Sequence, residues 1–202
     1  MITIGILASH EGTTLQAVLD ACRSETLPAR VGIVISNNSD SGALRRAREA
    51  GVQVAHLSGQ THPDAESLDA AICANLQAHR VDIVLLAGYM KQLGPKTLGA
   101  FRNRILNTHP ALLPKYGGKG MYGLRVHQTV LASGESITGV SIHLVDEEYD
   151  TGPIIAQCSV PVVPGDTPET LAARVQQNER KLVVEVLTGI VKGTLHLPDS
   201  GS

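Results

Sequence analysis

The stretch Asp82-Ile83-Val84-Leu85-Leu86-Ala87 is the strongest strand signal in the chain, because it is a short and almost entirely apolar run. A helical pattern over Pro63–His79 leads into it. Closer to the N-terminus, three other short apolar runs alternate with two helical patterns: Ile2–Ala8, Gly12–Cys22, Val31–Ser36, Asp40–Ala50 and Val52–Leu57. This alternation predicts a parallel sheet with helices on both faces, a doubly wound α/β fold.

The pattern changes after residue 100, where strands follow one another more closely. Three further short strands are expected there: Arg104–Thr108, Thr138–Val145 and Pro153–Val163. A final helix is expected to begin with Thr167 as N-cap and Pro168 as first helical residue, and to run to about Lys192. We expect a single domain over residues 1–195 and a loose polar tail over residues 196–202.

The composition argues against several classes of protein. The 202-residue chain is 43% hydrophobic, enough for a sizeable core, and its 17 basic residues nearly balance its 19 acidic ones. A near-neutral chain carries no electrostatic footprint for nucleic acid and no polybasic segment for a membrane. The N-terminus has neither a basic region nor a long apolar run, so we expect no signal peptide and no membrane span.

The cysteines and histidines argue against a disulfide framework and a metal site. Cys22, Cys73 and Cys158 are far apart, odd in number and form no CxxC pair. The sequence contains no HExxH motif and no His–Cys cluster. We therefore expect free thiols, a cytoplasmic location and no bound metal.

In open α/β sheets, ligands bind beyond the carboxyl ends of the strands. That rule selects four segments: Ser9–Thr14, Gly88–Leu93, Asn107–Tyr116 and Asp146–Gly152. The first opens a helix, where free N–H groups and the helix dipole favour an anion. Gly12 would let a phosphate approach, and Thr13 and Thr14 could add hydrogen bonds. An ordinary capped turn is the alternative, since the segment matches neither GxGxxG nor a Walker A loop.

Asn107 and His109 are two residues apart in a predicted strand, so their side chains should point to the same side. An amide donor and an imidazole aimed at one point can stabilise an oxyanion. A satisfied polar pair at a strand end is the other interpretation. Asp150 stands just before a tight Gly152-Pro153 turn, whereas the other acidic residues of that loop are expected to be solvated.

Two more segments could either fill the core or bind a ligand. The strand exit Ala87–Leu93 carries Met90 and an aromatic residue, which are typical of a core and of a pocket alike. The apolar stripe of the last helix is interrupted at Asn178 or Glu179. Because polar groups on an inward-facing turn are usually paired or functional, this turn and Gln176 form a candidate binding site.

Together these segments resemble the folate-dependent formyltransferases. Six segments carry the resemblance, in the order in which that family has them: Gly12–Gln16, Ala87–Met90, Asn107–Tyr116, Gly139–His143, Asp150–Pro153 and Arg174–Glu179. The first, second and last are similar to those of members that formylate glycinamide ribonucleotide (GAR). The resemblance extends over about residues 1–192 and implies a single-domain, Rossmann-like formyltransferase fold with an open, mostly parallel sheet.

The resemblance also implies an activity and a set of residues. A formyl group would pass from 10-formyltetrahydrofolate, the co-substrate, to the amine of GAR in de novo purine biosynthesis. The implied catalytic residues are Asn107, His109 and Asp150. The first two would stabilise an oxyanion, and Asp150 would favour the charged form of His109 and accept a proton through water.

The implied binding residues fall into two groups. Those for the phosphate and ribose of the substrate are Gly12, Thr13, Thr14, Gln176 and Glu179, and those for folate are Met90, Lys91, Gln92, Leu93, Asn107, Val145 and Asp146. The partners implied are these two small molecules, without nucleic acid, membrane or metal, and we expect a monomer or a homodimer.

The chain departs from the family at three places. Thr13-Thr14 stands where Ser-Asn is usual, Lys91 where arginine is common, and Ala65 where an arginine often meets the folate tail. These changes concern binding of the folate tail rather than the chemistry. The glycine-rich segment Gly117–Gly123 is similar to a variant lid loop.

Four rival interpretations fit less well. A formyltetrahydrofolate deformylase usually has an extra N-terminal domain, which is not expected because the first strand begins at Ile2. A methionyl-tRNA formyltransferase would need a further C-terminal domain and a basic surface. A sugar-nucleotide formyltransferase fits the phosphate loop less closely. A non-catalytic nucleotide-binding module would require the three implied catalytic residues to occur together by chance.

Overall fold

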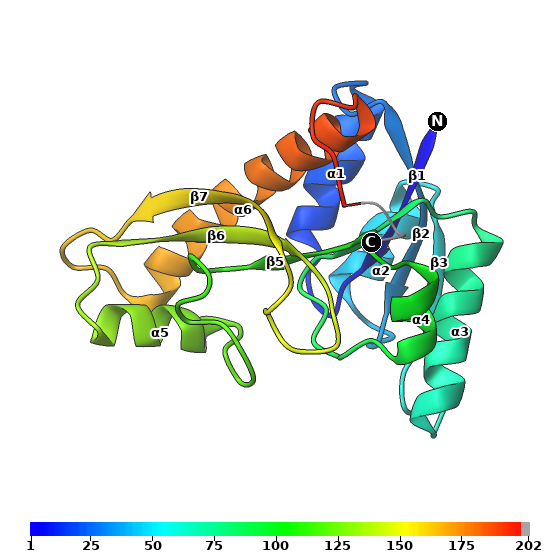
Figure 1. Ribbon diagram of the computed structural model, residues 1–202, viewed down its shortest axis with the longest axis horizontal. Coiled ribbons are helices and arrows are strands. Elements are labelled where there is room, and N and C mark those ends of the chain that lie inside the picture. Colours follow the sequence, from blue (N-terminus) through cyan, green and yellow to red (C-terminus); the bar gives the residue numbers. More distant parts are fainter. Residues whose placement is uncertain (199–202) are drawn as a thin grey trace.

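Seven strands form one open sheet in the computed structural model, which describes residues 1–198 (Figure 1). They are β1 (Ile2–Leu7), β2 (Ala29–Ser36), β3 (Gln53–His56), β4 (Ile83–Leu86), β5 (Ile105–His109), β6 (Ile137–Leu144) and β7 (Ile154–Pro161). Their order across the sheet is β3-β2-β1-β4-β5-β6-β7. Strands β1 to β5 pair in parallel, and β6 and β7 extend one edge in antiparallel fashion. The predicted open, mostly parallel sheet is confirmed.

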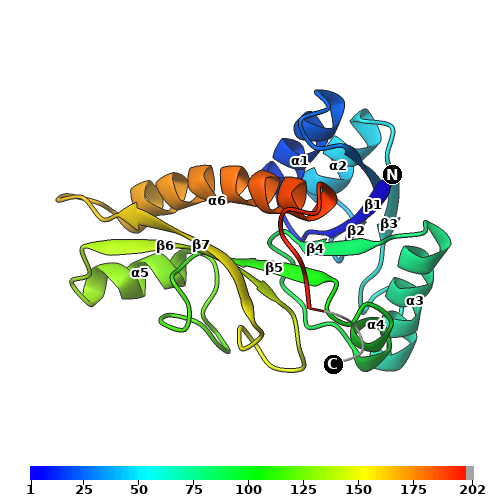
Figure 2. The ribbon, with the colours of Figure 1, turned by 45° about the horizontal axis from the view of Figure 1, so that its top comes forward.

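Helices cover both faces of this sheet, as predicted. They are α1 (Thr13–Arg23), α2 (Gly42–Glu49), α3 (Ala65–Ala78), α4 (Pro95–Ala100), α5 (Leu124–Ala132) and α6 (Pro168–Val191). Residues of α1, α2 and α6 share one hydrophobic cluster with the sheet, and residues of α3 and α4 pack into a second cluster. Figure 2 shows α1, α2 and α6 above the sheet and α3 and α4 below it.

Strand β4 forms where the sequence signal is strongest because both of its faces are buried. Val84 and Leu86 belong to the cluster under α3 and α4, whereas Ile83 and Leu85 belong to the cluster under α6. A parallel strand that is covered on both faces is expected to be apolar throughout rather than alternating. Full burial of each such side chain stabilises the fold by about 1.5–3 kcal/mol.

Helix α4 was not predicted from the sequence. It is short, begins at Pro95, and receives its N-terminal cap from a different helix. The buried carboxylate of Asp69 in α3 accepts hydrogen bonds from the backbone N–H groups of Lys96 (2.7 Å) and Thr97 (3.0 Å). A cap supplied from 27 residues earlier in the chain leaves no local sequence pattern.

Helix α6 begins as predicted. The Thr167 side chain accepts a hydrogen bond from the N–H of Thr170, whose hydroxyl accepts one from the N–H of Thr167 in return. The predicted tail is described only to residue 198, where Leu197 packs against the first cluster, and residues 199–202 lie outside the described part. No helix within residues 1–198 is long and apolar enough to span a membrane.

Candidate active site

Strand β5 positions the two central polar side chains. Ile105 packs into the cluster under α3 and α4 and Leu106 into the cluster under α6, so successive side chains point to opposite faces. Asn107 and His109 therefore share the face of Ile105, as the sequence predicted. The antiparallel neighbour β6 places His143 opposite Asn107.

The side chains of His109 and His143 converge on Asp150, which lies in the loop between β6 and β7, and Asn107 joins this group through His143. Its Oδ2 is 3.4 Å from Nδ1 of His109, and its Oδ1 is 3.4 Å from Nε2 of His143. The same Nε2 lies 3.0 Å from the amide nitrogen of Asn107, which can donate a hydrogen bond to it. The His109 and His143 residues are only 3% and 2% exposed, so these contacts lie in a largely water-free environment. The structure thus brings all three predicted catalytic residues together.

The hydrogen-bond partners define which ring nitrogens carry protons. Nε2 of His109 lies 2.7 Å from the carbonyl oxygen of Tyr116, and Nδ1 of His143 lies 2.8 Å from that of Leu144. A carbonyl can only accept, so both of these nitrogens must carry hydrogen. Nδ1 of His109 and Nε2 of His143 are the remaining ring nitrogens, and both face Asp150.

Burial and charge act in opposite directions on this group. Burial lowers the pKa of His109 below its ordinary value, while the charge of Asp150 and the Tyr116 carbonyl act to raise it. Burial would also raise the pKa of Asp150, but its contact with His143, the hydrogen bond from the Gly118 N–H and the charge of His109 together lower it. Asp150 is therefore ionised at neutral pH, and its attraction for the His109 proton only partly offsets the cost of charging a buried ring.

A tight turn holds Asp150 in place. Its φ of 59° is in the left-handed region, which aspartate tolerates better than most residues but which still carries strain. The N–H of Gly118 donates to Oδ2 at 3.0 Å. Two residues on, Gly152 passes so close to the Leu144 carbonyl that any Cβ would collide with it. The backbone of this loop is thus specified by a strained aspartate and an obligatory glycine.

A second polar cluster lies on the other face of β5. Oε1 of Glu179, from α6, accepts hydrogen bonds from the hydroxyls of Thr14 (2.9 Å) and Thr108 (3.1 Å). Thr108 points away from Asn107 and His109, towards α6. The interruption of the α6 stripe is therefore filled by a contact with the start of α1, two residues after Gly12. Burial raises the pKa of Glu179, and the two hydroxyls only partly counter it.

The start of α1 has the features of an anion site. Gly12 is its N-cap, with a φ of 69°, and no side chain caps the first turn. Any Cβ at Gly12 would meet the backbone of Ala43 in α2, so only glycine fits. The first N–H groups of a helix lack partners within the helix and point outwards. Thr13 and Gln176 are exposed, and neither makes a hydrogen bond with a side chain within residues 1–198.

Two of the residues predicted to bind folate, Lys91 and Gln92, line a cavity, and hydrogen bonds tie their segment to neighbouring loops. The N–H of Met90 donates to the hydroxyl of Ser9 at 2.8 Å, and Nε2 of Gln92 donates to the Glu147 carbonyl at 2.8 Å. Lys91 and Gln92 line a cavity of about 660 Å³, together with residues from the ends of β2 and β3 and the start of α3: Asn37, Asn38, Ser39, His56, Ser58, Gly59, Gln60, His62, Pro63, Asp64, Ala65 and Leu68.

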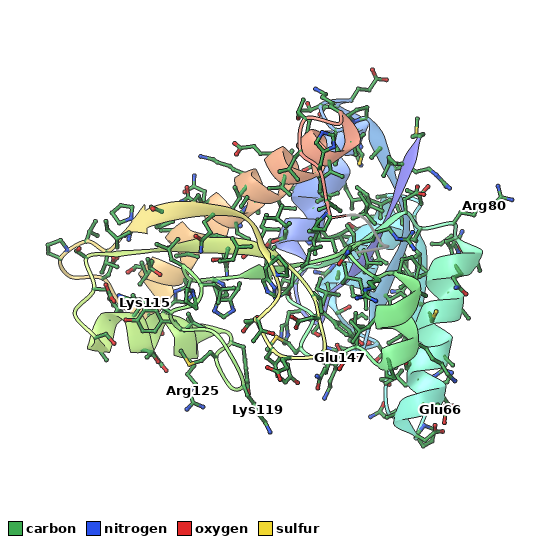
Figure 3. All side chains as sticks on the ribbon, in the orientation of Figure 1. Glu66, Arg80, Lys115, Lys119, Arg125 and Glu147 are labelled. Carbon is green, nitrogen blue, oxygen red and sulfur yellow. The ribbon has the colours of Figure 1, made fainter. Side chains whose placement is uncertain are left out.

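The other predicted folate residues differ in their surroundings. Leu93 is buried in the second cluster, and Val145 donates its N–H to the Ile105 carbonyl. Asp146 accepts hydrogen bonds from the Glu148 N–H and the Thr151 hydroxyl, so it stabilises its own loop. Figure 3 shows Lys119 and Glu147 on neighbouring loops that project to the same side of the molecule.

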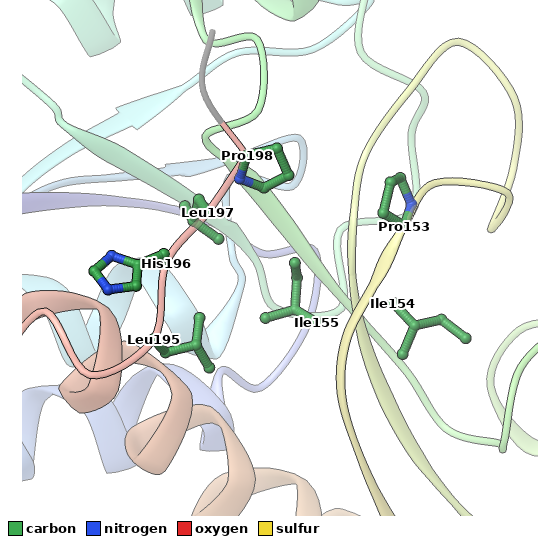
Figure 4. A pocket seen from close by; sticks show the side chains of 7 residues that line it. All are labelled: Pro153, Ile154, Ile155, Leu195, His196, Leu197 and Pro198. Atoms are coloured by element: carbon green, nitrogen blue, oxygen red, sulfur yellow. The ribbon is translucent and has the colours of Figure 1, made fainter. Parts of the chain in front are cut away.

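A separate groove of about 680 Å³ is lined by none of the predicted site residues (Figure 4). Its walls come from the start of β7 and from the segment after α6: Pro153, Ile154, Ile155, Leu195, His196, Leu197 and Pro198. Within residues 1–198, no three His, Cys, Asp or Glu side chains are grouped so as to hold a metal ion.

His143 was not among the predicted site residues, although it lies in one of the segments that resemble the folate-dependent formyltransferases. A histidine two residues after Ser141 in an apolar strand gives only a weak signal. Its importance depends on the register that pairs Asn107 with His143 across 36 residues of chain. The signal that could have identified His143 is a pair of polar residues that face each other across two adjacent antiparallel strands.

An amide, two histidines and an ionised aspartate beyond the carboxyl end of a doubly wound sheet define a site for transfer of an acyl group by charge stabilisation and proton removal. Residues 2–187 match the model of the family described as formyl transferase, and the chain belongs to that family.

Individual relatives agree with this assignment. The chain is 38% identical to "Phosphoribosylglycinamide formyltransferase" of Haemophilus influenzae, over 99% of this chain and 92% of that protein. It is 35% identical to the Escherichia coli protein of the same name, over 100% and 92% of the two chains. The crystal structure of glycinamide ribonucleotide transformylase 1 from Symbiobacterium toebii superposes with a TM-score of 0.91 at 42% identity, covering 99% and 92%.

Proposed function

We propose that this protein transfers the formyl group of 10-formyltetrahydrofolate to the amine of GAR, as a cytoplasmic monomer or homodimer in de novo purine biosynthesis. The observation that carries this proposal is the convergence of His109 and His143 on the ionised carboxylate of Asp150, with Asn107 held beside them by His143. Membership of the formyl transferase family and near-complete alignment with GAR formyltransferases support the choice of donor and acceptor.

Formyl transfer to an amine places two demands on the protein. Negative charge develops on the formyl oxygen, and the attacking amine must lose a proton. The amide nitrogen of Asn107 carries two hydrogens, of which one is directed to His143, so the second can donate to the developing charge. A donor that needs no proton change and is fixed by a neighbour costs no reorganisation during the reaction, and such donors each contribute about 3–4 kcal/mol in other enzymes.

His109 and Asp150 meet the second demand. The Tyr116 carbonyl fixes the hydrogen of His109 on Nε2, leaving Nδ1 to hold or release a proton next to Asp150. Because the pKa of Asp150 is lowered, its carboxylate is available as an acceptor at neutral pH, directly or through a water molecule. When Nδ1 of His109 is protonated, the nearby carboxylate would stabilise the positive charge of the ring, and the Nδ1–H would donate to the formyl oxygen.

The two substrates are assigned to the two sides of this centre. The uncapped start of α1 at Gly12 and Thr13 would hold the GAR phosphate, and Glu179 and Gln176 would reach its ribose. The hydroxyl of Thr14 already donates to Glu179, so we assign Thr14 to the phosphate through its N–H and to Glu179 through its side chain.

The folate would lie across the loops at Met90–Leu93 and Val145–Asp146, which Gln92 ties together. The cavity beside these loops supports this placement of the folate. Its wall carries a positive charge at Lys91, and residue 65 in the same wall is alanine rather than arginine. In this chain Lys91 is therefore the residue assigned to the anionic end of the folate.

The test is an absorbance assay that follows consumption of 10-formyltetrahydrofolate, or of its stable dideaza analogue, with and without GAR. We expect consumption only when GAR is present. Equal consumption without GAR would indicate a deformylase and would overturn the proposal. No consumption under either condition would overturn it as well.

Two variants connect this activity to the proposed site. Asp150→Asn keeps the shape of the side chain but removes its charge, and should abolish most GAR-dependent consumption. Asp40→Asn makes the same chemical change at an exposed residue that, within residues 1–198, makes a single hydrogen bond through its own backbone N–H, and it should behave as the native protein. Equal activity of the two variants would exclude Asp150 from the reaction.

A further inference from the structure

A buried serine anchors the loop that follows β5. The side chain of Ser141, in β6, is fully buried, and its hydroxyl makes three hydrogen bonds. It donates to the Ala111 carbonyl at 2.7 Å and accepts from the Leu113 N–H at 2.9 Å. The third bond is accepted from the amide of Gln157 in β7 at 2.8 Å.

Gln157 completes this anchor. Its amide nitrogen also donates to the Leu113 carbonyl at 3.0 Å, so both polar backbone groups of Leu113 are held by side chains of the sheet. The strand register aligns His109 with Ser141, and Ser141 with Gln157, in one row across three strands. The three side chains therefore share one face of the sheet, with the loop lying over them.

The far end of the same loop contacts the catalytic groups. Tyr116 presents its carbonyl to Nε2 of His109 at 2.7 Å, and Gly118 donates its N–H to Asp150 at 3.0 Å. Neither contact involves a side chain of the loop, so both depend on where the backbone lies. The backbone at Leu113 is only three residues from Tyr116, and Tyr116 itself has a positive φ of 60° that allows little alternative geometry.

We infer that Ser141 and Gln157 are positioning residues for His109: they hold the 111–118 loop so that the Tyr116 carbonyl keeps a hydrogen on Nε2 and leaves Nδ1 for the reaction. The kinetic part of this inference rests on the proposed function, but the position of the His109 proton does not. Loss of the anchor lets the carbonyl move, and the ring is then free to adopt its other tautomer.

The first test is kinetic. Ser141→Ala should lower the turnover number about 10- to 100-fold, because small displacements of a catalytic group have effects of that size, while KM for both substrates changes little. Gln157→Ala removes a more exposed partner, and loss of its two hydrogen bonds should lower turnover about fivefold or more, with a smaller loss than for Ser141→Ala. Ser141→Thr retains the hydroxyl and should restore most of the turnover.

A matched control comes from α5. Ser133→Ala also deletes a hydroxyl that donates to a backbone carbonyl, that of Thr129 at 2.9 Å, but it does so on the surface. This variant should have native turnover. If Ser141→Ala does not fold, the inference is tested with Gln157→Ala, whose side chain is exposed.

The second test separates positioning from a merely structural role. Nitrogen-15 NMR of the histidine rings, with His109 assigned from a His109→Gln variant, should show a hydrogen on Nε2 in the native protein and a mixture of tautomers in Ser141→Ala and Gln157→Ala. Reduced thermal stability with unchanged turnover and an unchanged His109 signal would overturn the inference. A native protein without formyl transfer would overturn the proposed function, and the NMR result would still decide the inference.

Discussion

Asp150 and Glu179 lie on opposite faces of strand β5, and each accepts hydrogen bonds from side chains or backbone of several elements. Asp150 is surrounded by groups that can carry positive charge or donate strongly: two histidines and a backbone N–H. Glu179 receives only two neutral hydroxyls, from Thr14 and Thr108. The pKa of Asp150 is lowered as a result, whereas burial raises the pKa of Glu179.

The comparison shows how one fold assigns different tasks to similar groups. Burial opposes ionisation of both carboxyls, and the donors decide whether that effect is overcome. Asp150 can act as a proton acceptor at neutral pH, while Glu179 is suited to bridging α1, β5 and α6 and to meeting a sugar hydroxyl. Substitutions on the two faces should therefore fail in different ways.

The largest effect is expected on the Asp150 face. His109→Ala and Asp150→Asn should each reduce turnover about 10²- to 10⁴-fold, the range for loss of a general acid or base, while circular dichroism shows that the fold is kept. Steady-state kinetics with both substrates measures the change. Native turnover in either variant would remove that residue from the catalytic assignment.

The next effect concerns the loop that carries Asp150. Gly152→Ala should destabilise the protein by about 1–3 kcal/mol, the cost of overpacking, because the new Cβ meets the Leu144 carbonyl. Turnover should fall as well, since Asp150 is two residues away. Gly59→Ala, at a surface turn where a Cβ meets nothing within 4 Å, is the control and should melt like the native protein. Equal unfolding free energies for the two variants would contradict this explanation.

Much of this arrangement could be predicted from the sequence, for reasons that these residues illustrate. The buried strand at 83–86 is apolar on both faces and therefore conspicuous. The two-residue spacing of Asn107 and His109 places them on one face of any strand. The gap in the α6 stripe indicated a paired or functional polar group at Asn178 or Glu179, and Glu179 is paired with the Thr14 hydroxyl, while its role in binding stays a prediction.

The rest depends on contacts between distant parts of the chain. His143 lies in the site because the register of β6 against β5 places it opposite Asn107, and this register cannot be predicted from the sequence. The Tyr116 carbonyl and the Gly118 N–H act through the backbone, so no side-chain type marks them. Burial lowers the pKa of His109 more than the charge of Asp150 raises it. The extent of this burial is known only from the packed structure.

A smaller effect is expected on the Glu179 face. Glu179→Ala leaves the hydroxyls of Thr14 and Thr108 without their acceptor and should cost about 1–3 kcal/mol of stability. Glu179→Gln retains an acceptor oxygen of the same shape and should cost less than about 1 kcal/mol. Chemical denaturation of both variants measures the difference. Similar losses in the two variants would mean that the charge of Glu179, rather than its hydrogen bonds, holds the three elements together.

The smallest effect is a difference in how stability depends on pH. The pKa of Glu179 is raised on folding, so the folded state holds this proton more tightly than the unfolded chain. Its contribution to stability is complete below the unfolded pKa of about 4.3 and is lost as the pH rises through the folded value. The native protein should therefore lose stability relative to Glu179→Gln as the pH is raised from about 4.

His109 should show the opposite sign. Its pKa is lowered on folding, so its contribution is present above the unfolded value of about 6.5 and is lost as the pH falls towards the folded value. The native protein should lose stability relative to His109→Gln as the pH is lowered from about 6.5. Melting temperatures of the three proteins between pH 4 and 8 test both signs at once, with differences of a few degrees expected for a chain of this size. Parallel curves for all three would show that neither His109 nor Glu179 changes its protonation on folding, which would contradict the opposite pKa shifts of these two groups.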